Sequence, residues 1–207
     1  RALGLKWMDG LPMLVAQAKA AEDFFTGRAI PDTENERILA ILRRSAENIV
    51  LIGMPGSGKT TVGAALAART GRKAVDLDAE LERRAGRPIP EIFASEGEAG
   101  FRERERQVTA DWGRESGMIL MCGGGVVKTP ENENALRQNG RIYQLLRSPE
   151  LLATGGRPLS QGKDLAAMYR ERRPLYERFR DAAVENRGTP EETADTIWRD
   201  FCEHTGD

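Results

Sequence analysis

Residues 53–60 read Gly-Met-Pro-Gly-Ser-Gly-Lys-Thr and match the pattern G-x-x-x-x-G-K-[ST] of a phosphate-binding loop. Its glycines permit a tight turn that points successive backbone N–H groups at phosphate oxygens, and a helix that begins at Lys59 favours the same anion through its dipole. The pattern predicts that Lys59 reaches the β and γ phosphates of a nucleoside triphosphate and that the Thr60 hydroxyl holds Mg²⁺. The residues expected to bind this nucleotide are Gly53, Gly56, Ser57, Gly58, Lys59, Thr60 and Thr61.

Two aspartates, Asp76 and Asp78, lie at the carboxyl end of a second predicted strand, residues 73–77. Residues two apart on an extended chain face the same side, and the carboxyl end of a parallel strand opens onto the ligand crevice. One carboxylate is then placed near Mg²⁺ and the other near a hydroxyl of the phosphate acceptor. The alternative is that both are solvated acids that cap the next helix.

An arginine and a run of glycines are further candidates. Arg102 and Glu105 are three residues apart in a charged predicted helix, so Glu105 can orient Arg102 toward an anionic ligand, although a solvated helix face would look similar. Gly123, Gly124 and Gly125 follow the third predicted strand directly. They suggest backbone that comes close to a ligand, or else a flexible exit from the strand.

Two more arginines lie toward the C-terminus. Arg157 follows Thr154-Gly155-Gly156, a Gly-rich segment that is a candidate mobile lid able to bring a cation to the transferring phosphoryl group. Arg172 lies on the helix that follows. Taken alone, either arginine is more often a surface charge than a ligand.

The segments between these motifs alternate between strand and helix, which is typical of a parallel sheet covered on both faces. This α/β arrangement would bring the motifs to one edge of the sheet. A strand before residue 53 and an Ala-rich helix after it also argue against an ordinary glycine-rich turn. We predict strands at 48–53, 73–77, 118–122, 141–146 and 182–185, with helices near 79–85, 89–95, 98–116, 130–138, 164–180 and 190–204.

Composition excludes several classes of protein. The 31 basic and 32 acidic side chains nearly cancel, which gives no overall attraction to nucleic acid or to an anionic membrane. A single histidine, His204, leaves no His-based metal site or His-dependent triad. Cys122 and Cys202 are expected to be reduced thiols. No apolar stretch approaches the ~20 residues needed to cross a bilayer and no secretory signal is evident, so we expect a cytoplasmic protein. We also expect a monomer.

The ordered motifs resemble one family, the shikimate kinases, over residues 48 to about 205. They are the phosphate loop, Asp76-Leu77-Asp78, I-F-A-S-E-G-E-x-x-F-R-x-x-E, a hydrophobic run into three glycines, R-P-L and R-x-P-L-Y. The resemblance implies a P-loop fold like that of nucleoside monophosphate kinases, with a five-stranded parallel sheet flanked by helices. It also implies ATP-dependent phosphorylation of the 3-hydroxyl of shikimate, a step of chorismate and aromatic amino acid biosynthesis.

The resemblance implies a role for each matching residue. Lys59 and Thr60 would hold the ATP phosphates and Mg²⁺, with Asp76 binding the metal through water. Asp78 would hydrogen-bond the shikimate hydroxyls and is the candidate base, while Arg157 would neutralise charge on the γ-phosphoryl group. The residues expected to grip the substrate or to line its ring are Asp78, Phe93, Phe101, Arg102, Gly123, Gly124, Gly125, Pro158 and Arg172.

The predicted lid departs from the family pattern. Many members carry an arginine just before Thr-Gly-Gly that packs on the adenine, whereas here Leu152 and Ala153 precede Thr154. Arg157 also follows Gly156 directly, so the lid is shortened. We expect Arg157 to keep its role, and Arg187 is the candidate to contact adenine instead.

The N-terminal extension is a second departure. Residues 4–27 resemble the closing helix region of shikimate dehydrogenases, in which the residues matching Met13 and Gln17 lie near nicotinamide and substrate. The other motifs of that family are missing, so this segment cannot transfer hydride, and an amphipathic packing helix is the alternative. We divide the chain into a helical extension, residues 1–43, and a kinase domain, residues 44–207. Because the chain begins with Arg1, our hypothesis is that it is the kinase part of a longer dehydrogenase-kinase polypeptide.

Two other functions are weighed against shikimate phosphorylation. Another small-molecule kinase on the same scaffold, such as a gluconate-type kinase, would not need the paired arginines. A nucleotide-binding domain without turnover is suggested by the shortened lid and the N-terminal segment.

Overall fold

The computed structural model describes residues 10–147 and 165–206. The chain divides into two compact units: Ala46–Phe201 form one, and Arg1–Ser45 with Cys202–Asp207 form the other. The predicted boundary between residues 43 and 44 falls within the last turn of helix α2 (Asp32–Ala46). The functional division into an extension and a kinase domain therefore stays a prediction.

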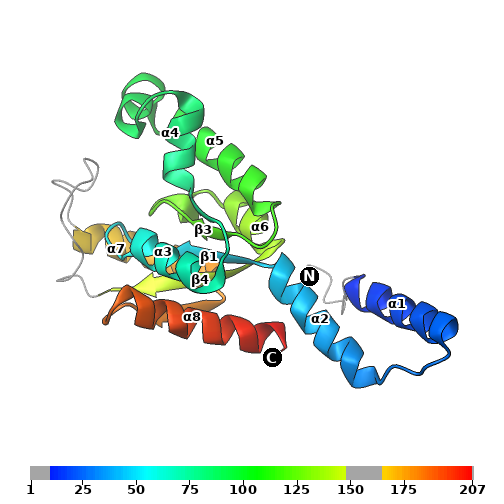
Figure 1. The fold of residues 1–207 in the computed structure, drawn as a ribbon. Coiled ribbons are helices and arrows are strands. Elements are labelled where there is room, and N and C mark those ends of the chain that lie inside the picture. The colour runs from blue at the N-terminus through cyan, green and yellow to red at the C-terminus, as the bar shows by residue number, and fades with distance from the viewer. Residues whose placement is uncertain (1–9, 148–164, 207) are drawn as a thin grey trace. The chain divides into compact units, whose positions relative to one another are not determined.

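The larger unit is built on a parallel five-stranded sheet with the order β2-β3-β1-β4-β5 (Figure 1). The central strand reads Asn-Ile-Val-Leu-Ile and is buried along its whole length, as expected for a strand covered on both faces. The predicted fold class is thus confirmed. The strands are β1 (Asn48–Ile52), β2 (Ala74–Asp76), β3 (Ile119–Met121), β4 (Gly140–Leu146) and β5 (Ala182–Glu185).

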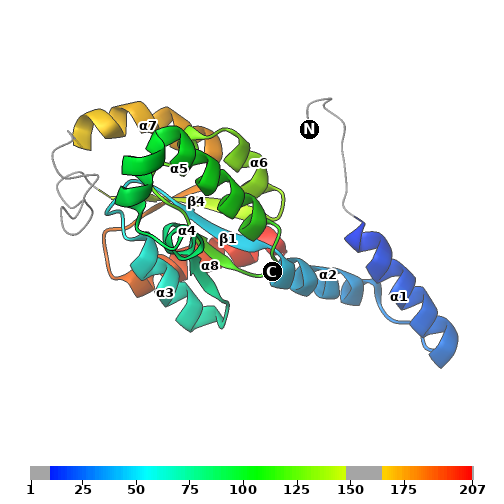
Figure 2. The same cartoon turned by 90° about the horizontal axis from the view of Figure 1, so that it is seen from above.

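Alternate residues of β1 enter two separate hydrophobic cores. Val50 and Ile52 pack on the face covered by α5 (Ile89–Gly113), α6 (Glu131–Arg137) and α7 (Leu165–Phe179). Ile49 and Leu51 pack on the opposite face with α3 (Lys59–Thr70) and α8 (Pro190–Thr205), as Figure 2 shows. Because alternate side chains of β1 point to opposite faces, the sheet packs against helices on both sides and forms the middle of three layers.

The strand order brings two loops together at the carboxyl ends of β1 and β3. The strands pair in register from Ile49 opposite Ile119 to Leu51 opposite Met121, and the Cys122 amide donates to the Leu51 carbonyl at 3.0 Å. The phosphate loop leaves the end of β1, and the three glycines leave the end of β3. In open α/β sheets this edge is where ligands bind.

The predicted division between helices at 89–95 and 98–116 is confirmed, because α5 is broken at Gly97, whose φ of 70° is left-handed and suits glycine. Two predicted helix ends are wrong in detail. The second part of α5 ends at Gly113 and not at residue 116. Helix α4 (Leu77–Ala85) begins two residues earlier than predicted. It does so because the Asp76 side chain accepts the N–H groups of Asp78 and Ala79 and caps the helix.

The smaller unit contains α1 (Leu11–Thr26) and most of α2. The Lys19 ammonium bridges them through Asp23 at 3.1 Å and Asp32 at 3.4 Å, and Asp23 also accepts the N–H of Ile30. Helix α2 begins at Asp32, where the acidic residues of its first turn favour a helix N-terminus.

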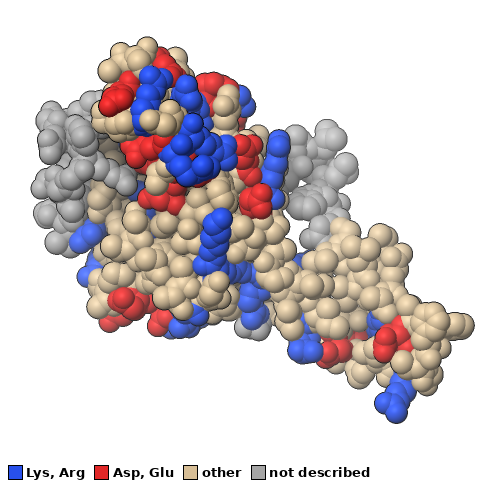
Figure 3. Space-filling model, turned by 45° about the horizontal axis from the view of Figure 1, so that its top comes forward, with Lys and Arg blue, Asp and Glu red and all other residues tan. Residues whose placement is uncertain are grey.

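Charged side chains of both signs gather on the face formed by α4 and α5 (Figure 3). Many are paired: Glu80 accepts from Arg83 and Arg84 on its own helix, and these hydrogen bonds lower the pKa of Glu80 to about 2. Arg84 also reaches Asp111 of α5 at 2.5 Å. Among the described helices, none is both long and apolar enough to span a membrane.

Candidate active site

The phosphate loop takes its shape from three glycines with positive φ, namely Gly53 (146°), Gly56 (79°) and Gly58 (94°). A side chain is disfavoured at these angles. At Gly53 a Cβ would also lie 2.7 Å from the Leu145 carbonyl oxygen. The loop thus joins β1 to α3 in a conformation that only glycine permits at these positions.

Lys59, the first residue of α3, folds back over this loop. Its ammonium donates to the carbonyl oxygens of Gly53 and Met54, both at 2.9 Å, and the residue is only 7% exposed. The cation is therefore held at the loop that the motif predicts to bind phosphates.

Asn186 is a contact of the phosphate loop that the sequence reasoning missed. Its amide donates to the Ser57 carbonyl at 2.7 Å and accepts from the Thr193 hydroxyl at 3.0 Å. A Cβ on Gly58 would overlap the same amide. The signal was available, because Asn186 follows β5 at the carboxyl edge of the sheet. Arg187 has a side chain 78% exposed and pairs with Glu185 at 3.1 Å, and its contact with adenine stays a prediction.

Thr60 and Asp76 form a polar pair beside the loop. The Thr60 hydroxyl lies 3.2 Å from Oδ2 of Asp76, while Oδ1 of Asp76 caps α4. The expectation that Asp76 and Asp78 share one side of a strand is wrong, because β2 ends at Asp76 and Asp78 lies in the first turn of α4. A hydroxyl and a carboxylate oxygen are hard donors of the kind Mg²⁺ prefers, with water and phosphate completing its shell. These residues therefore fit the predicted metal.

The three glycines after β3 make room for side chains of the site. A Cβ on Gly123 would overlap the Asp78 carboxylate, and one on Gly125 would lie 2.6 Å from the Arg102 guanidinium nitrogens. At Gly124 it would lie 2.7 Å from the Pro55 ring of the phosphate loop. The glycines thus bring Asp78, Arg102 and the phosphate loop against one short segment of backbone.

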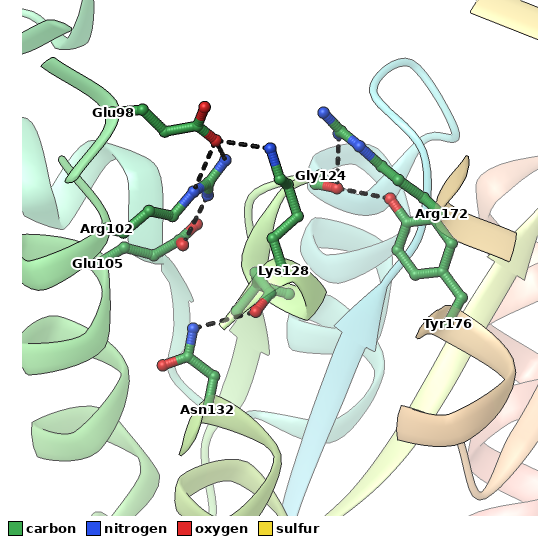
Figure 4. Close-up of polar contacts among 9 residues, drawn as sticks. Glu98, Arg102, Glu105, Gly124, Lys128, Asn132, Arg172 and Tyr176 are labelled. Atoms are coloured by element: carbon green, nitrogen blue, oxygen red, sulfur yellow. Dashed lines mark hydrogen bonds and ion pairs between the residues drawn. The ribbon is translucent and has the colours of Figure 1, made fainter. Parts of the chain in front are cut away.

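Arg102 is oriented by a buried carboxylate, as predicted. Its Nη1 donates to Glu105 at 2.7 Å (Figure 4). Glu105 is 5% exposed, and burial raises the pKa of this carboxyl despite the opposing effect of Arg102. The pair holds a planar cation at the glycine segment, the geometry that suits a carboxylate ligand.

Helix α7 contributes a second arginine on the other side of the glycine segment (Figure 4). Arg172 Nη1 and the Tyr176 hydroxyl both donate to the Gly124 carbonyl, at 2.9 and 2.6 Å. Burial raises the pKa of Tyr176 to about 12, so the hydroxyl stays protonated. Tyr176 lies in the R-x-P-L-Y motif but was assigned no role from sequence.

The two predicted ring-lining phenylalanines stack on each other with centroids 4.5 Å apart. Phe101 is 5% exposed and belongs to the hydrophobic core, whereas Phe93 is only partly buried. The Arg102 guanidinium lies 5.0 Å from the Phe101 ring centre. The Phe101 ring therefore packs against the Arg102 guanidinium. Of the two rings, that of Phe93 is the more exposed to solvent.

Several predictions cannot be placed. Arg157, Pro158 and the segment Thr154-Gly155-Gly156 lie outside the described residues. Cys122 and Cys202 form no disulfide with each other or with another described residue, as predicted, and burial raises the pKa of the Cys122 thiol. An inert buried thiol is consistent with packing at the end of β3.

Sequence comparison identifies relatives for most of the larger unit. A family model described as shikimate kinase matches residues 55–201. A shikimate kinase from Burkholderia lata is 43% identical over 147 residues, covering 67% of this chain and 80% of the relative. One from Aromatoleum aromaticum is 39% identical over 173 residues, covering 75% and 99%.

Solved structures of shikimate kinases are also similar to this chain. The shikimate kinase from Acinetobacter baumannii in complex with shikimate is similar with a TM-score of 0.73 and 34% identity, over 80% of this chain and 98% of that one. The enzyme from Aquifex aeolicus has a TM-score of 0.67 and 29% identity, over 77% and 99%. The chain belongs to the shikimate kinase family.

Proposed function

We propose that this chain transfers the γ-phosphoryl group of ATP to the 3-hydroxyl of shikimate. The observation that carries the proposal is the meeting of Arg102, Arg172 and Asp78 at the three glycines beside the phosphate loop. Two guanidinium groups suit the carboxylate of a small hydroxylated acid, and a carboxylate suits its hydroxyls. The site thus offers complementary groups to an acceptor with one anionic end.

The donor half of the site would bind ATP through the phosphate loop. Backbone N–H groups and Lys59 would hold the β and γ phosphates, with Thr60 and Asp76 as the residues for Mg²⁺. When bound, this ion neutralises charge on the phosphate oxygens. Arg157 would add a cation at the γ-phosphoryl group, and its role is supported by the sequence motif alone.

The acceptor half would position the attacking hydroxyl. Asp78 would accept its hydrogen bond and take its proton as the new P–O bond forms and the bond to the β-phosphate oxygen breaks, releasing ADP. Arg102 and Arg172 would hold the substrate carboxylate and fix the ring orientation. Since phosphoryl transfer depends on positioning and charge neutralisation, these residues supply what the reaction requires.

The test is ADP release measured with shikimate, with gluconate and without acceptor, for wild type, Asp78→Asn and Arg157→Ala. We expect shikimate-dependent turnover that both substitutions abolish or nearly abolish. Turnover with gluconate alone would refute the proposal, and ATP binding without any turnover would favour a silent nucleotide-binding domain.

The place of this reaction in chorismate biosynthesis belongs to the same proposal, because it follows from the proposed substrate. We also keep the expectation of a cytoplasmic location. We also retain the hypothesis that a shikimate dehydrogenase domain precedes this chain. It is supported by the helix at Leu11–Thr26, on which Met13 and Gln17 are exposed. A stop codon and start site directly before the codon for Arg1 would refute this hypothesis.

A further inference from the structure

Glu98 and Lys128 form an ion pair beside Arg102 to which the proposed reaction assigns no role. Glu98 lies in the I-F-A-S-E-G-E segment of the sequence motif, and Lys128 ends the short 3₁₀ helix (Val126–Lys128) after the three glycines. The Lys128 ammonium is 2.6 Å from Oε1 of Glu98 (Figure 4). The pair therefore joins α5 to the glycine segment at the position of Arg102.

The distances around Arg102 are unequal. Its Nη1 is 2.7 Å from Glu105, whereas its Nε and Nη2 are 3.4 and 3.3 Å from the Glu98 oxygen that Lys128 holds. Nε and Nη2 form an edge of the guanidinium that can donate two parallel hydrogen bonds to a carboxylate. Arg102 is thus firmly bound to Glu105 and only loosely bound to Glu98 at the edge that suits a ligand.

Lys128 stands on a well-anchored element, and the Glu98 side chain is more exposed than that of Lys128. The Lys128 amide donates to the Gly125 carbonyl at 2.9 Å, and Asn132 donates to the Val126 carbonyl at 3.0 Å. The Glu98 side chain is 54% exposed, so it has room to move. The hydrogen bond from Lys128 also lowers the pKa of Glu98, which keeps it an anion able to compete for Arg102.

We propose that Lys128 is a positioning residue that holds the Glu98 carboxylate back from Nε and Nη2 of Arg102. This leaves the Nε–Nη2 edge of the guanidinium for the substrate carboxylate. Without Lys128, the attraction between Glu98 and Arg102 would draw the two into a bidentate pair. This inference rests on the proposed function, because the ligand of Arg102 is the acid of the acceptor. Lys128 would then set the affinity for the acceptor and not for ATP.

A simpler role for Lys128 is direct binding of the substrate carboxylate. The two roles differ when Glu98 is also neutralised. If Lys128 restrains Glu98, then removing both charges restores access to Arg102. If Lys128 binds the substrate itself, the double variant stays as impaired as the single one.

The experiment compares steady-state kinetics of wild type, Lys128→Met, Glu98→Gln and the double variant, with shikimate and ATP varied separately. For Lys128→Met we expect the KM for shikimate to rise about five- to tenfold, with kcat and the KM for ATP unchanged. Lys128→Met/Glu98→Gln should return to the wild-type KM, and Lys128→Arg should retain it. Glu103→Gln, which neutralises an exposed carboxylate paired with Arg106 on the same helix, is the matched control.

An unchanged KM for Lys128→Met, or a double variant as impaired as Lys128→Met, would overturn the inference. A raised KM for Glu98→Gln alone would also overturn it, and this holds even if Lys128→Met fails to fold. Direct calorimetric binding of shikimate to each variant must follow the same order as the KM values. Absence of shikimate turnover in wild type is a different result, since it removes the proposed function itself.

Discussion

Gly125→Ala separates the role of the glycine segment in substrate binding from its role in folding. The backbone of Gly125 has φ −103° and ψ 0°, which alanine can adopt, so the substitution introduces little strain of its own. The added Cβ would lie 2.6 Å from two nitrogens of Arg102, whereas an ordinary contact begins at 3.4 Å. Arg102 must therefore move by about 0.8 Å.

This displacement sets the expected magnitude. A shift of that size lengthens or breaks the 2.7 Å bond to Glu105 and misplaces the guanidinium edge that receives the carboxylate. A hydrogen bond to a charged group contributes about 1.5–3 kcal/mol. Loss of one at the substrate carboxylate corresponds to a decrease in kcat/KM for shikimate of about 10- to 100-fold. Global stability should change little, because the displaced atoms are the far end of a flexible side chain.

The assay is ADP release with shikimate and ATP varied in turn, together with chemical unfolding of each variant. Gly10→Ala adds the same methyl group where no heavy atom lies within 4 Å and serves as the control. We expect Gly125→Ala to raise the KM for shikimate and to leave the KM for ATP unchanged. A wild-type KM for shikimate, or an equal rise in both KM values, would refute the placement of Arg102 against Gly125.

Three further predictions concern neighbouring groups. Asn186→Ala should lower the free energy of unfolding by about 2–3 kcal/mol and raise the KM for ATP, because it leaves the buried Ser57 carbonyl without its amide partner; urea unfolding and kinetics check this. Since burial raises the pKa of Glu105 in the folded protein, that carboxyl stabilises the fold below its unfolded pKa and this contribution is lost as pH rises through the folded pKa. Glu105→Gln should therefore remove a decrease in stability that sets in as pH rises above about 4.5, and an unchanged pH profile of unfolding would contradict it. Tyr176→Phe should cost about 1 kcal/mol of stability with a small effect on kcat, since Arg172 still donates to the Gly124 carbonyl; a large loss of kcat would show a catalytic role instead.

Local sequence determined the strands, the phosphate loop and the pairing of Arg102 with Glu105. Each of these depends on residues close together in the chain: a short apolar run buried along β1, glycine conformations at 53–58, and a three-residue spacing on one helix face. A few neighbouring residues are enough to set the backbone geometry on which such features depend. The order of the motifs also indicated the family that the comparisons show.

Tertiary structure decided the contacts between segments far apart in the chain. The sequence indicated only the edge of the sheet at which Asn186 lies, and not that its amide binds the Ser57 carbonyl. Nor could it set Tyr176 and Arg172 on the Gly124 carbonyl, or show that Gly125 makes room for Arg102. These contacts arise because the strand order puts the ends of β1, β3 and β5 at one edge of the sheet, and a pattern along the chain carries no record of that order. The contact between Asp78 and Gly123 was also decided by the folded structure. Extended spacing predicted one side of a strand, but the cap formed by Asp76 turned Asp78 into the first turn of α4 and against Gly123.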